Sequence, residues 1–326
     1  MGQPAVKRDR AFITWLGMRS SFLRQLRCNN TRVNYGSTLK QFRQFLTAYD
    51  RDLDPIFGDY ISLRKAVEAW VWEQGTEIKE SSISTKLSRI KEFYDYLVSD
   101  YMVIDKNPAY RIRVTNLDAP TVLVIPESDD VDALLANIKY LSTGMDDIPG
   151  RRDGLLIRFL REGGFRASEV LPLTLGDCNI SGSVKIRIGK GNKSRTTAVL
   201  PETVQEAYSF ASQFGLEETD YLFMSTVYYK FPWTPKSRKR QRDGAQHLTY
   251  RGLGTMLGRR AKEAGFTKKE VSVLRRAHSY RHLWAVEHVK AKTDHILLMR
   301  MAGWSSSSMI NYYIGETALD VHAVRR

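Results

Sequence analysis

The segment KNPAYRIRVTNLDAPTVLVIPES, residues 106–128, divides the chain into two parts with different sequence patterns. It contains Pro108, Pro120 and Pro126, and its apolar residues follow no helical period. Because proline lacks the backbone N–H that a helix interior needs, we expect an extended linker here. The boundaries that we predict are 15–108 for the first domain, 109–124 for the linker and 125–326 for the second domain.

The part before this linker has the pattern of a small all-helical bundle. Apolar residues recur every three or four positions in three stretches, residues 31–49, 62–75 and 81–103. The third stretch opens with serines, and we expect Ser81 or Ser82 to be the N-cap of its helix.

The part after the linker is also mainly helical, but it contains a pair of β-type runs. These runs alternate in VKIRIGKGNKSRTTAVLP, residues 184–201, and the turn residues 189–192 join them into a hairpin. Upstream, a helical pattern breaks at Gly163 and Gly164 and resumes from about Ala167. The predicted fold is therefore an all-helical first domain and a mixed, mainly α second domain with a small antiparallel hairpin.

The bulk composition narrows the class of protein. The chain has 326 residues, of which 42% are hydrophobic, and no apolar run approaches the length of a membrane span. The N-terminus lacks the apolar stretch of a secretory signal. The two cysteines, Cys28 and Cys178, lie far apart without metal-ligand spacing, so we expect both to be reduced. These features predict a cytoplasmic protein with no membrane partner.

The chain is strongly basic, with a formal net charge of +14. Such a charge favours a polyanion as partner, most often nucleic acid, although a merely basic protein is the alternative. Residues 230–244, KFPWTPKSRKRQRDG, form a cationic segment that either contacts phosphates or is a solvated loop. The basic residues that we expect to contact DNA are Arg32, Lys40, Arg43 and Lys86 in the first domain, and Lys236, Arg238, Lys239, Arg240 and Arg242 in this segment.

Several familiar site motifs are incomplete. His278 and His282 have the spacing of a helical metal pair, but no third ligand stands out and Arg281 between them would repel a cation. The turn GKGNKS lacks the spacing of a nucleotide-binding P-loop and lies on a hairpin. We therefore expect neither a metal nor a nucleotide cofactor.

Four basic side chains, some of them in these same segments, suit another chemistry. They are Arg166 after the glycine break, Lys190 on the hairpin turn, and His278 and Arg281 on one expected helix. Together they can surround a phosphodiester and stabilise the extra negative charge of a pentacoordinate transition state. A tyrosine further along the chain can attack the phosphorus and hold it covalently.

These residues lie in four motifs that resemble those of tyrosine recombinases, the phage-integrase-like and Xer-like site-specific DNA recombinases. GFRASEVLPL resembles the first arginine box of that family, and IRIGKGNKSRTTAVLP resembles its hairpin with a lysine. HSYRHLWAVEHV resembles the second box, and MAGWSSSSMINYYIG resembles the last. The motifs occur in the family's order, whereas the first domain resembles the family's core-binding domain only in pattern.

The resemblance implies a role for each motif residue. Arg166, which Glu169 would orient, and Arg281 become a phosphate clamp. Lys190 becomes the general acid for the leaving 5′-hydroxyl, with Lys193 as a competitor, and His278 becomes the general base or a phosphate donor. Trp304 takes a position that is His in many relatives, and its indole N–H can donate to phosphate but cannot exchange protons.

The resemblance also selects between two adjacent tyrosines. The family's nucleophile follows the Trp304 position by nine residues, which is Tyr313. Neighbours on a helix point about 100° apart, so we expect Tyr312 to be a packing residue. We expect His282 to be a core histidine.

The implied activity is DNA strand transfer through a 3′-phosphotyrosine, without ATP or metal. The implied partners are duplex DNA with inverted-repeat sites, a homotetramer on that DNA, and optional accessory DNA-bending proteins. A type IB topoisomerase and a non-catalytic recombinase-derived DNA-binding protein stay open as alternatives. The DNA target and the biological role, which could be integration, excision or resolution of a mobile element, stay open too. The final segment, residues 316–326, is expected to form a short helix, which the resemblance implies docks on the next subunit, with docking on its own subunit as the alternative.

Overall fold

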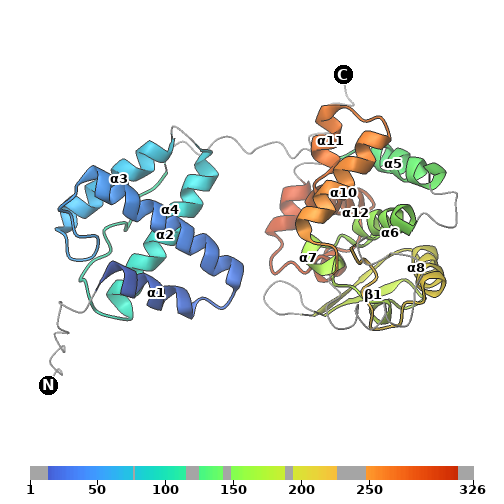
Figure 1. Cartoon of the computed structure of the whole chain (residues 1–326), viewed down its shortest axis with the longest axis horizontal. Coiled ribbons are helices and arrows are strands. Elements are labelled where there is room, and N and C mark those ends of the chain that lie inside the picture. Colours follow the sequence, from blue (N-terminus) through green and yellow to red (C-terminus); the bar gives the residue numbers. More distant parts are fainter. Residues whose placement is uncertain are drawn as a thin grey trace. The chain divides into compact units, whose positions relative to one another are not determined.

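The computed structural model describes residues 14–75, 78–114, 125–141, 148–187, 194–225 and 247–314. The chain divides into two compact units, Met1–Thr121 and Val122–Arg326. Each unit buries an apolar core of its own. The first unit is drawn in blue to cyan in Figure 1, and the second in green to red.

The first unit is a bundle of helices around an aromatic core. Trp15 meets Phe93 edge-on with ring centroids 4.9 Å apart, and Phe42 meets Trp70 edge-on at 5.6 Å. The sequence pattern did not indicate the first of these helices, although it carries Trp15. The helices are α1 (Trp15–Gln25), α2 (Asn29–Tyr49), α3 (Tyr60–Gly75) and α4 (Glu80–Ser99).

The start of α4 corrects one prediction. Its N-cap is Lys79, whose carbonyl accepts the N–H of Ser82 at 2.9 Å and that of Ile83 at 3.2 Å. Ser81 and Ser82 therefore lie inside the first turn, and neither caps the helix. Beyond α4, Ala109 and Ile112 are buried in the core of the first unit.

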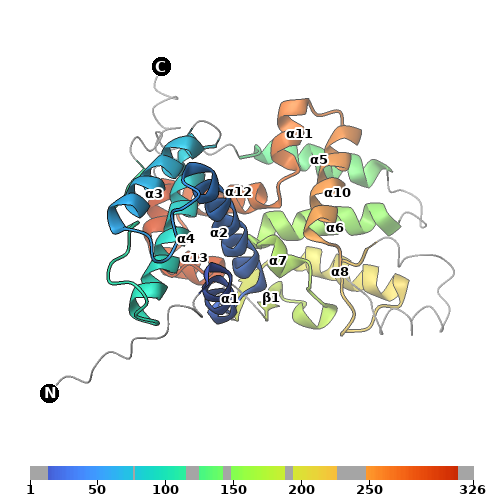
Figure 2. The same cartoon turned by 60° about the vertical axis from the view of Figure 1, so that its left-hand side comes forward.

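The second unit is mainly helical and is organised around α6. Figures 1 and 2 both show α5, α6 and α8 one below another, with α10 crossing α5 and α6. Its helices are α5 (Ser128–Leu141), α6 (Ile148–Gly163), α7 (Ala167–Val170), η2 (Leu175–Asp177), α8 (Pro201–Phe214), α10 (Tyr250–Glu263), α11 (Lys268–Leu274), α12 (Ala277–Lys290) and α13 (His295–Ala302). A last helical segment covers residues 308–314.

The second unit also contains the predicted hairpin. Strands β1 (Ser183–Ile186) and β2 (Arg195–Ala198) are antiparallel, with Ile186 opposite Arg195. Helix α13 packs against β2. The fold class predicted from the sequence, a helical unit followed by a mainly α unit with one small antiparallel sheet, is confirmed.

A separate apolar cluster joins the last helices of the second unit. Trp284 on α12 and Leu298 on α13 pack with Tyr313 of the last helical segment, and all three are buried. This cluster holds residues 308–314 beside α12.

The two cysteines differ in exposure. Cys28 is exposed at the N-cap of α2, whereas Cys178 is buried after η2. Among the described helices, none is long and apolar enough to cross a membrane.

Candidate active site

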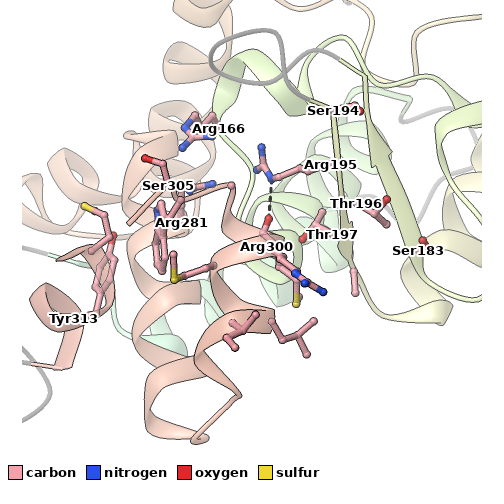
Figure 3. Close-up of a pocket in the computed structure, with 18 of the residues that line it drawn as sticks. Arg166, Ser183, Ser194, Arg195, Thr196, Thr197, Arg281, Arg300, Ser305 and Tyr313 are labelled. Carbon is pink, nitrogen blue, oxygen red and sulfur yellow. Dashed lines mark hydrogen bonds between the residues drawn. The ribbon is translucent and has the colours of Figure 1, made fainter. Parts of the chain in front are cut away.

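A cavity of about 1580 Å³ opens between β2, α12, α13 and the loop before α7. Figure 3 shows Arg166, Arg195 and Arg281 entering it from three separate segments. His278 and Tyr313 also line it. The predicted residues Arg166, His278, Arg281, Trp304 and Tyr313 are therefore brought together, although they come from distant parts of the sequence.

Arg166 is the N-cap residue of α7, and the backbone two residues before it packs closely against a tryptophan ring. Gly164 has a φ of +56°, and a Cβ there would lie 2.3 Å from the ring of Trp284. Only glycine fits both conditions, which explains the break that the sequence shows at this point. The turn directs Arg166 into the cavity.

Glu169 holds Arg166 in place. Its Oε1 accepts the Nη1–H of Arg166 at 2.7 Å, and its Oε2 accepts the backbone N–H of Arg166 at 2.8 Å. Burial by itself would raise the pKa of this carboxyl, but hydrogen bonds from Arg195 and Arg166 lower it to about 2. Glu169 is therefore ionised at neutral pH and balances part of the positive charge of the site.

Arg281 on α12 is buried and ties two loops to the helix. Nη1 donates to the carbonyl of Gly164 at 2.6 Å, and Nη2 donates to that of Ala302 at 2.6 Å. Burial and the nearby guanidiniums of Arg166 and Arg195 lower the pKa of Arg281 to about 10, so it is still charged at neutral pH. A guanidinium has five N–H donors, which leaves three to meet an anion.

The hydroxyl of Tyr313 meets a histidine. It lies 2.5 Å from Nδ1 of His282, and the tyrosine side chain is 1% exposed. Burial raises the pKa of Tyr313 to about 12. Burial and the neighbouring His278 and Arg281 lower the pKa of His282 to about 4. The imidazole is therefore neutral at neutral pH, and Nδ1 accepts the hydroxyl hydrogen when the ring proton is on Nε2.

This contact corrects the interpretation of His282 as a core histidine. His282 is half-buried, but its hydrogen bond is to the tyrosine selected as nucleophile. Its ring also lies 4.4 Å from that of His278, edge to face. The four-residue spacing of the two histidines was the available signal, because it places both side chains on one face of α12.

Aromatic rings enclose Tyr313. Trp304 stacks on it with centroids 5.5 Å apart and an interplanar angle of 22°, and Tyr312 meets it edge-on at 5.3 Å. The guanidinium of Arg281 lies 5.7 Å from the ring of Trp304. Burial and the charges of Arg281 and Arg166 lower the pKa of His278, which favours its neutral form.

The structure does not describe several of the other predicted residues. Lys190, its competitor Lys193 and the cationic segment from Lys236 to Arg242 lie outside the described residues. In the first unit, Lys40 is exposed on α2, and Arg32 on the same helix donates Nε–H to the carbonyl of Leu26 at 2.6 Å.

Arg43 and Lys86 are both half-buried. Lys86 on α4 donates to Oε1 of Gln74 at 2.6 Å. Across the described residues, no three or more His, Cys, Asp or Glu side chains group as a metal site would require.

The second unit carries a site of arginine, histidine and tyrosine side chains, and the first unit is a helical bundle. Comparison with known families identifies the class of protein that has both. The model of the phage integrase family matches residues 127–319. The model of the phage integrase N-terminal SAM-like domain matches residues 21–100. The first match covers more than half of the chain, so the protein belongs to the phage integrase family.

Curated relatives are Xer-type tyrosine recombinases. The chain is 32% identical to tyrosine recombinase XerD of Pseudomonas aeruginosa over 176 residues, 54% of this chain and 55% of that protein. It is 24% identical to XerD of Caulobacter vibrioides over 285 residues, 87% of this chain and 85% of that one. The match thus spans about half the length of the first relative and most of the second.

Solved structures share the fold at low sequence identity. The Tn1549 transposon integrase in complex with transposon right end DNA is similar with a TM-score of 0.65, at 14% identity, over 96% of this chain and 100% of that chain. A lambda integrase tetramer bound to a Holliday junction is similar with a TM-score of 0.62, at 14% identity, over 92% and 76%.

Proposed function

We propose that this protein is a site-specific tyrosine recombinase that cleaves and rejoins DNA through a 3′-phosphotyrosine. The observation that carries this proposal is the Tyr313 hydroxyl, bonded to His282 at a cavity that Arg166 and Arg281 share. A phenol beside two guanidiniums suits attack on a phosphodiester, because the guanidiniums stabilise the negative charge that the attack adds.

The chemistry balances without an external cofactor. Tyr313 Oη forms a bond to phosphorus while the bond from phosphorus to the 5′-oxygen breaks. The phenolic proton leaves through the pair of His282 and His278, and Lys190 gives a proton to the 5′-oxygen. The 5′-hydroxyl of another strand then attacks the phosphotyrosine, which restores the phosphodiester and the tyrosine. The covalent intermediate conserves the bond energy, so no nucleotide hydrolysis is needed.

The proposed partners follow from this chemistry. Recombination between two duplexes needs four cleavages, and hence four tyrosines in a homotetramer. The substrate would be duplex DNA with inverted-repeat sites, held by the two domains, and accessory DNA-bending proteins would be optional. The net charge of +14 supports a polyanion substrate. A structural neighbour of the same fold is a tetramer on a Holliday junction.

Two alternatives to a recombinase can each be distinguished by a specific observation. A type IB topoisomerase would use similar chemistry on one duplex, but the SAM-like match in the first unit favours a recombinase. A non-catalytic descendant would be expected to lack part of the site, whereas Arg166, Lys190, His278, Arg281 and Tyr313 are all present in the sequence.

The test uses DNA that flanks the gene. We expect inverted repeats around a short core there, and a nicked duplex carrying them should trap a covalent protein–DNA adduct on a denaturing gel. Intact duplexes should exchange strands, which a topoisomerase would not do. Supercoil relaxation without exchange would favour the topoisomerase, and DNA binding without an adduct on any repeat would contradict the proposal.

A further inference from the structure

Arg195 begins β2, and every nitrogen of its guanidinium donates a hydrogen bond. Nη1 and Nη2 donate to the two carboxylate oxygens of Glu169 at 2.6 and 2.7 Å. Nε donates to the carbonyl of Met301 at 2.7 Å, the dashed line of Figure 3. The side chain is 9% exposed. Two parallel bonds to one carboxylate fix both the distance and the plane of the guanidinium.

The first partner of Arg195 is also the partner of Arg166. Oε1 of Glu169 accepts from both guanidiniums, at 2.6 Å from Arg195 and 2.7 Å from Arg166. One negative charge is thus shared between two positive ones, and a net positive charge faces the cavity. Without Arg195, the carboxylate would be free to turn both oxygens towards Arg166, which would neutralise Arg166 and draw it away from an anion.

The second partner of Arg195 lies at the end of α13. Arg195 binds the carbonyl of Met301, and Arg281 binds that of the next residue, Ala302. The following Gly303 has a φ of +64°, and a Cβ there would lie 3.0 Å from Cδ of Arg195. The arginine therefore packs directly on the turn that leads into Trp304.

These contacts connect segments that carry different parts of the site. In the sequence, β2 comes shortly after Lys190, α7 follows Arg166, and α13 precedes Trp304. We propose that Arg195 is a positioning residue that holds Arg166, through Glu169, and the turn of Gly303 and Trp304 in the geometry that a scissile phosphate requires. This inference rests on the proposed function and deepens it.

The stability of the fold alone is a weak reason for an arginine at position 195. A buried ion pair can often be replaced by apolar side chains at little cost in stability. Arg195 also lines the cavity beside Arg166 and Arg281, whereas an arginine that served only the core would need no access to it. The fork that orients Glu169 is a feature that lysine cannot reproduce, because its ammonium is a single point donor.

The test measures single-turnover cleavage of a nicked duplex by Arg195→Met and Arg195→Lys. Each duplex carries either a normal scissile phosphate or an uncharged methylphosphonate, which does not need the charge of Arg166. We expect both variants to slow cleavage of the phosphate by about 10²-fold, the cost of a small misplacement, and to slow cleavage of the methylphosphonate much less, because only the displaced turn of Gly303 and Trp304 still affects it. Arg195→Met should slow cleavage less in an Arg166→Ala background than in the wild type, because the part of its effect that acts through Arg166 is already lost.

A control on the same hairpin separates charge from position. Arg187 follows β1, its side chain is 58% exposed and it pairs with Asp177. Arg187→Ala removes the same charge but no contact of Glu169, and it should cleave at the wild-type rate. Wild-type rates for Arg195→Lys, or equal slowing on both substrates by both variants, would overturn the inference.

A structural measurement keeps this inference separate from the proposed function. In a crystal structure of Arg195→Met, Glu169 should turn towards Arg166 and the turn at Gly303 should shift. An unchanged arrangement would refute the positioning role even if the protein cleaves no DNA. A wild-type protein that forms no adduct would contradict the proposed function alone, and the crystal structure would still decide the role of Arg195.

Discussion

The two units bury different kinds of side chain. Among the described residues of the first unit, no Asp, Glu, Lys or Arg is buried, and its core is apolar and aromatic. The second unit buries charged residues in two groups, one around Asp153 and one around Glu169, and also buries Asp177, which pairs with Arg187. Buried charges are costly unless they are paired, so their presence marks the unit in which electrostatics serves more than packing.

The two charged groups within the second unit also differ. Asp153 accepts from Arg152 at 3.0 Å, Arg259 at 3.2 Å and Arg260 at 2.9 Å, and none of these residues lines the cavity. The group around Glu169 lies on the cavity. Asp153 thus holds arginines away from the cavity, whereas Glu169 holds arginines that line it.

The largest expected effect tests whether chemistry belongs to the second unit alone. Tyr313→Phe should abolish the covalent adduct while DNA affinity is retained, because only the attacking oxygen is removed. A denaturing gel of a nicked substrate measures the adduct, and a gel shift measures affinity. Tyr312→Phe, the matched control one residue away, should still form the adduct. Loss of the adduct in Tyr312→Phe with retention in Tyr313→Phe would reverse the assignment.

The next effect concerns stability and sharpens the contrast in buried charge. Asp153→Asn leaves Arg152 buried without a carboxylate and Arg260 with Glu263 alone, and it should lower the free energy of unfolding of the second unit by about 3–5 kcal/mol. Arg259→Ala removes the partly exposed member of the same group and should cost less than about 1 kcal/mol. Hydrogen exchange can report each unit separately. Weaker protection in the first unit rather than in the second would contradict this prediction.

A smaller effect concerns the hydrogen bond to Tyr313. His282→Ala removes the acceptor and should slow adduct formation by about 10–100-fold, since a misaimed nucleophile reacts slowly. His282→Asn keeps an acceptor oxygen near the position of Nδ1 but cannot take the phenolic proton, so it should be about as slow as His282→Ala. Single-turnover cleavage compares the two variants. If His282→Asn instead retains most of the rate, the histidine only orients the hydroxyl and the proposed proton path is wrong.

The smallest effect belongs to the first unit, whose contribution would be to affinity. Lys40→Ala removes an exposed cation from α2. If Lys40 binds a DNA phosphate, its removal should reduce the log–log salt slope of DNA binding by about 0.9. Glu68→Gln, at another exposed position of this unit, should leave the slope unchanged. Binding titrations over a range of salt concentrations measure both. An unchanged slope for Lys40→Ala would remove this lysine from the proposed interface.

Periodicity predicted the fold class. The motifs named five residues that line one cavity: Arg166, His278, Arg281, Trp304 and Tyr313. The spacing of apolar residues indicated α2 to α4, and alternation indicated β1 and β2, because these patterns record which side faces the core. Neither Arg195 nor the role of His282 could be predicted in this way. Their partners, Glu169, Met301 and Tyr313, are distant in sequence, and only the packing of α12 and α13 on β2 and α7 brings them together.

The N-cap predicted for α4 was wrong for a local reason. A serine at a helix start is a common capping signal, but the backbone of Lys79 already closes the first turn. The sequence pattern also did not show how short α7 is. It has only four residues, and Leu171 and Pro172 follow it.

The unequal exposure of the two cysteines gives the protein a natural attachment point for a spectroscopic label. Backbone hydrogen bonds from Thr31 and Asn30 at the start of α2 lower the pKa of the exposed Cys28, which favours its reactive thiolate. Burial raises the pKa of Cys178 to about 12, so that thiol stays protonated and shielded. A maleimide dye at neutral pH should therefore mark the first unit alone. Its fluorescence would follow DNA capture in real time without any engineered residue.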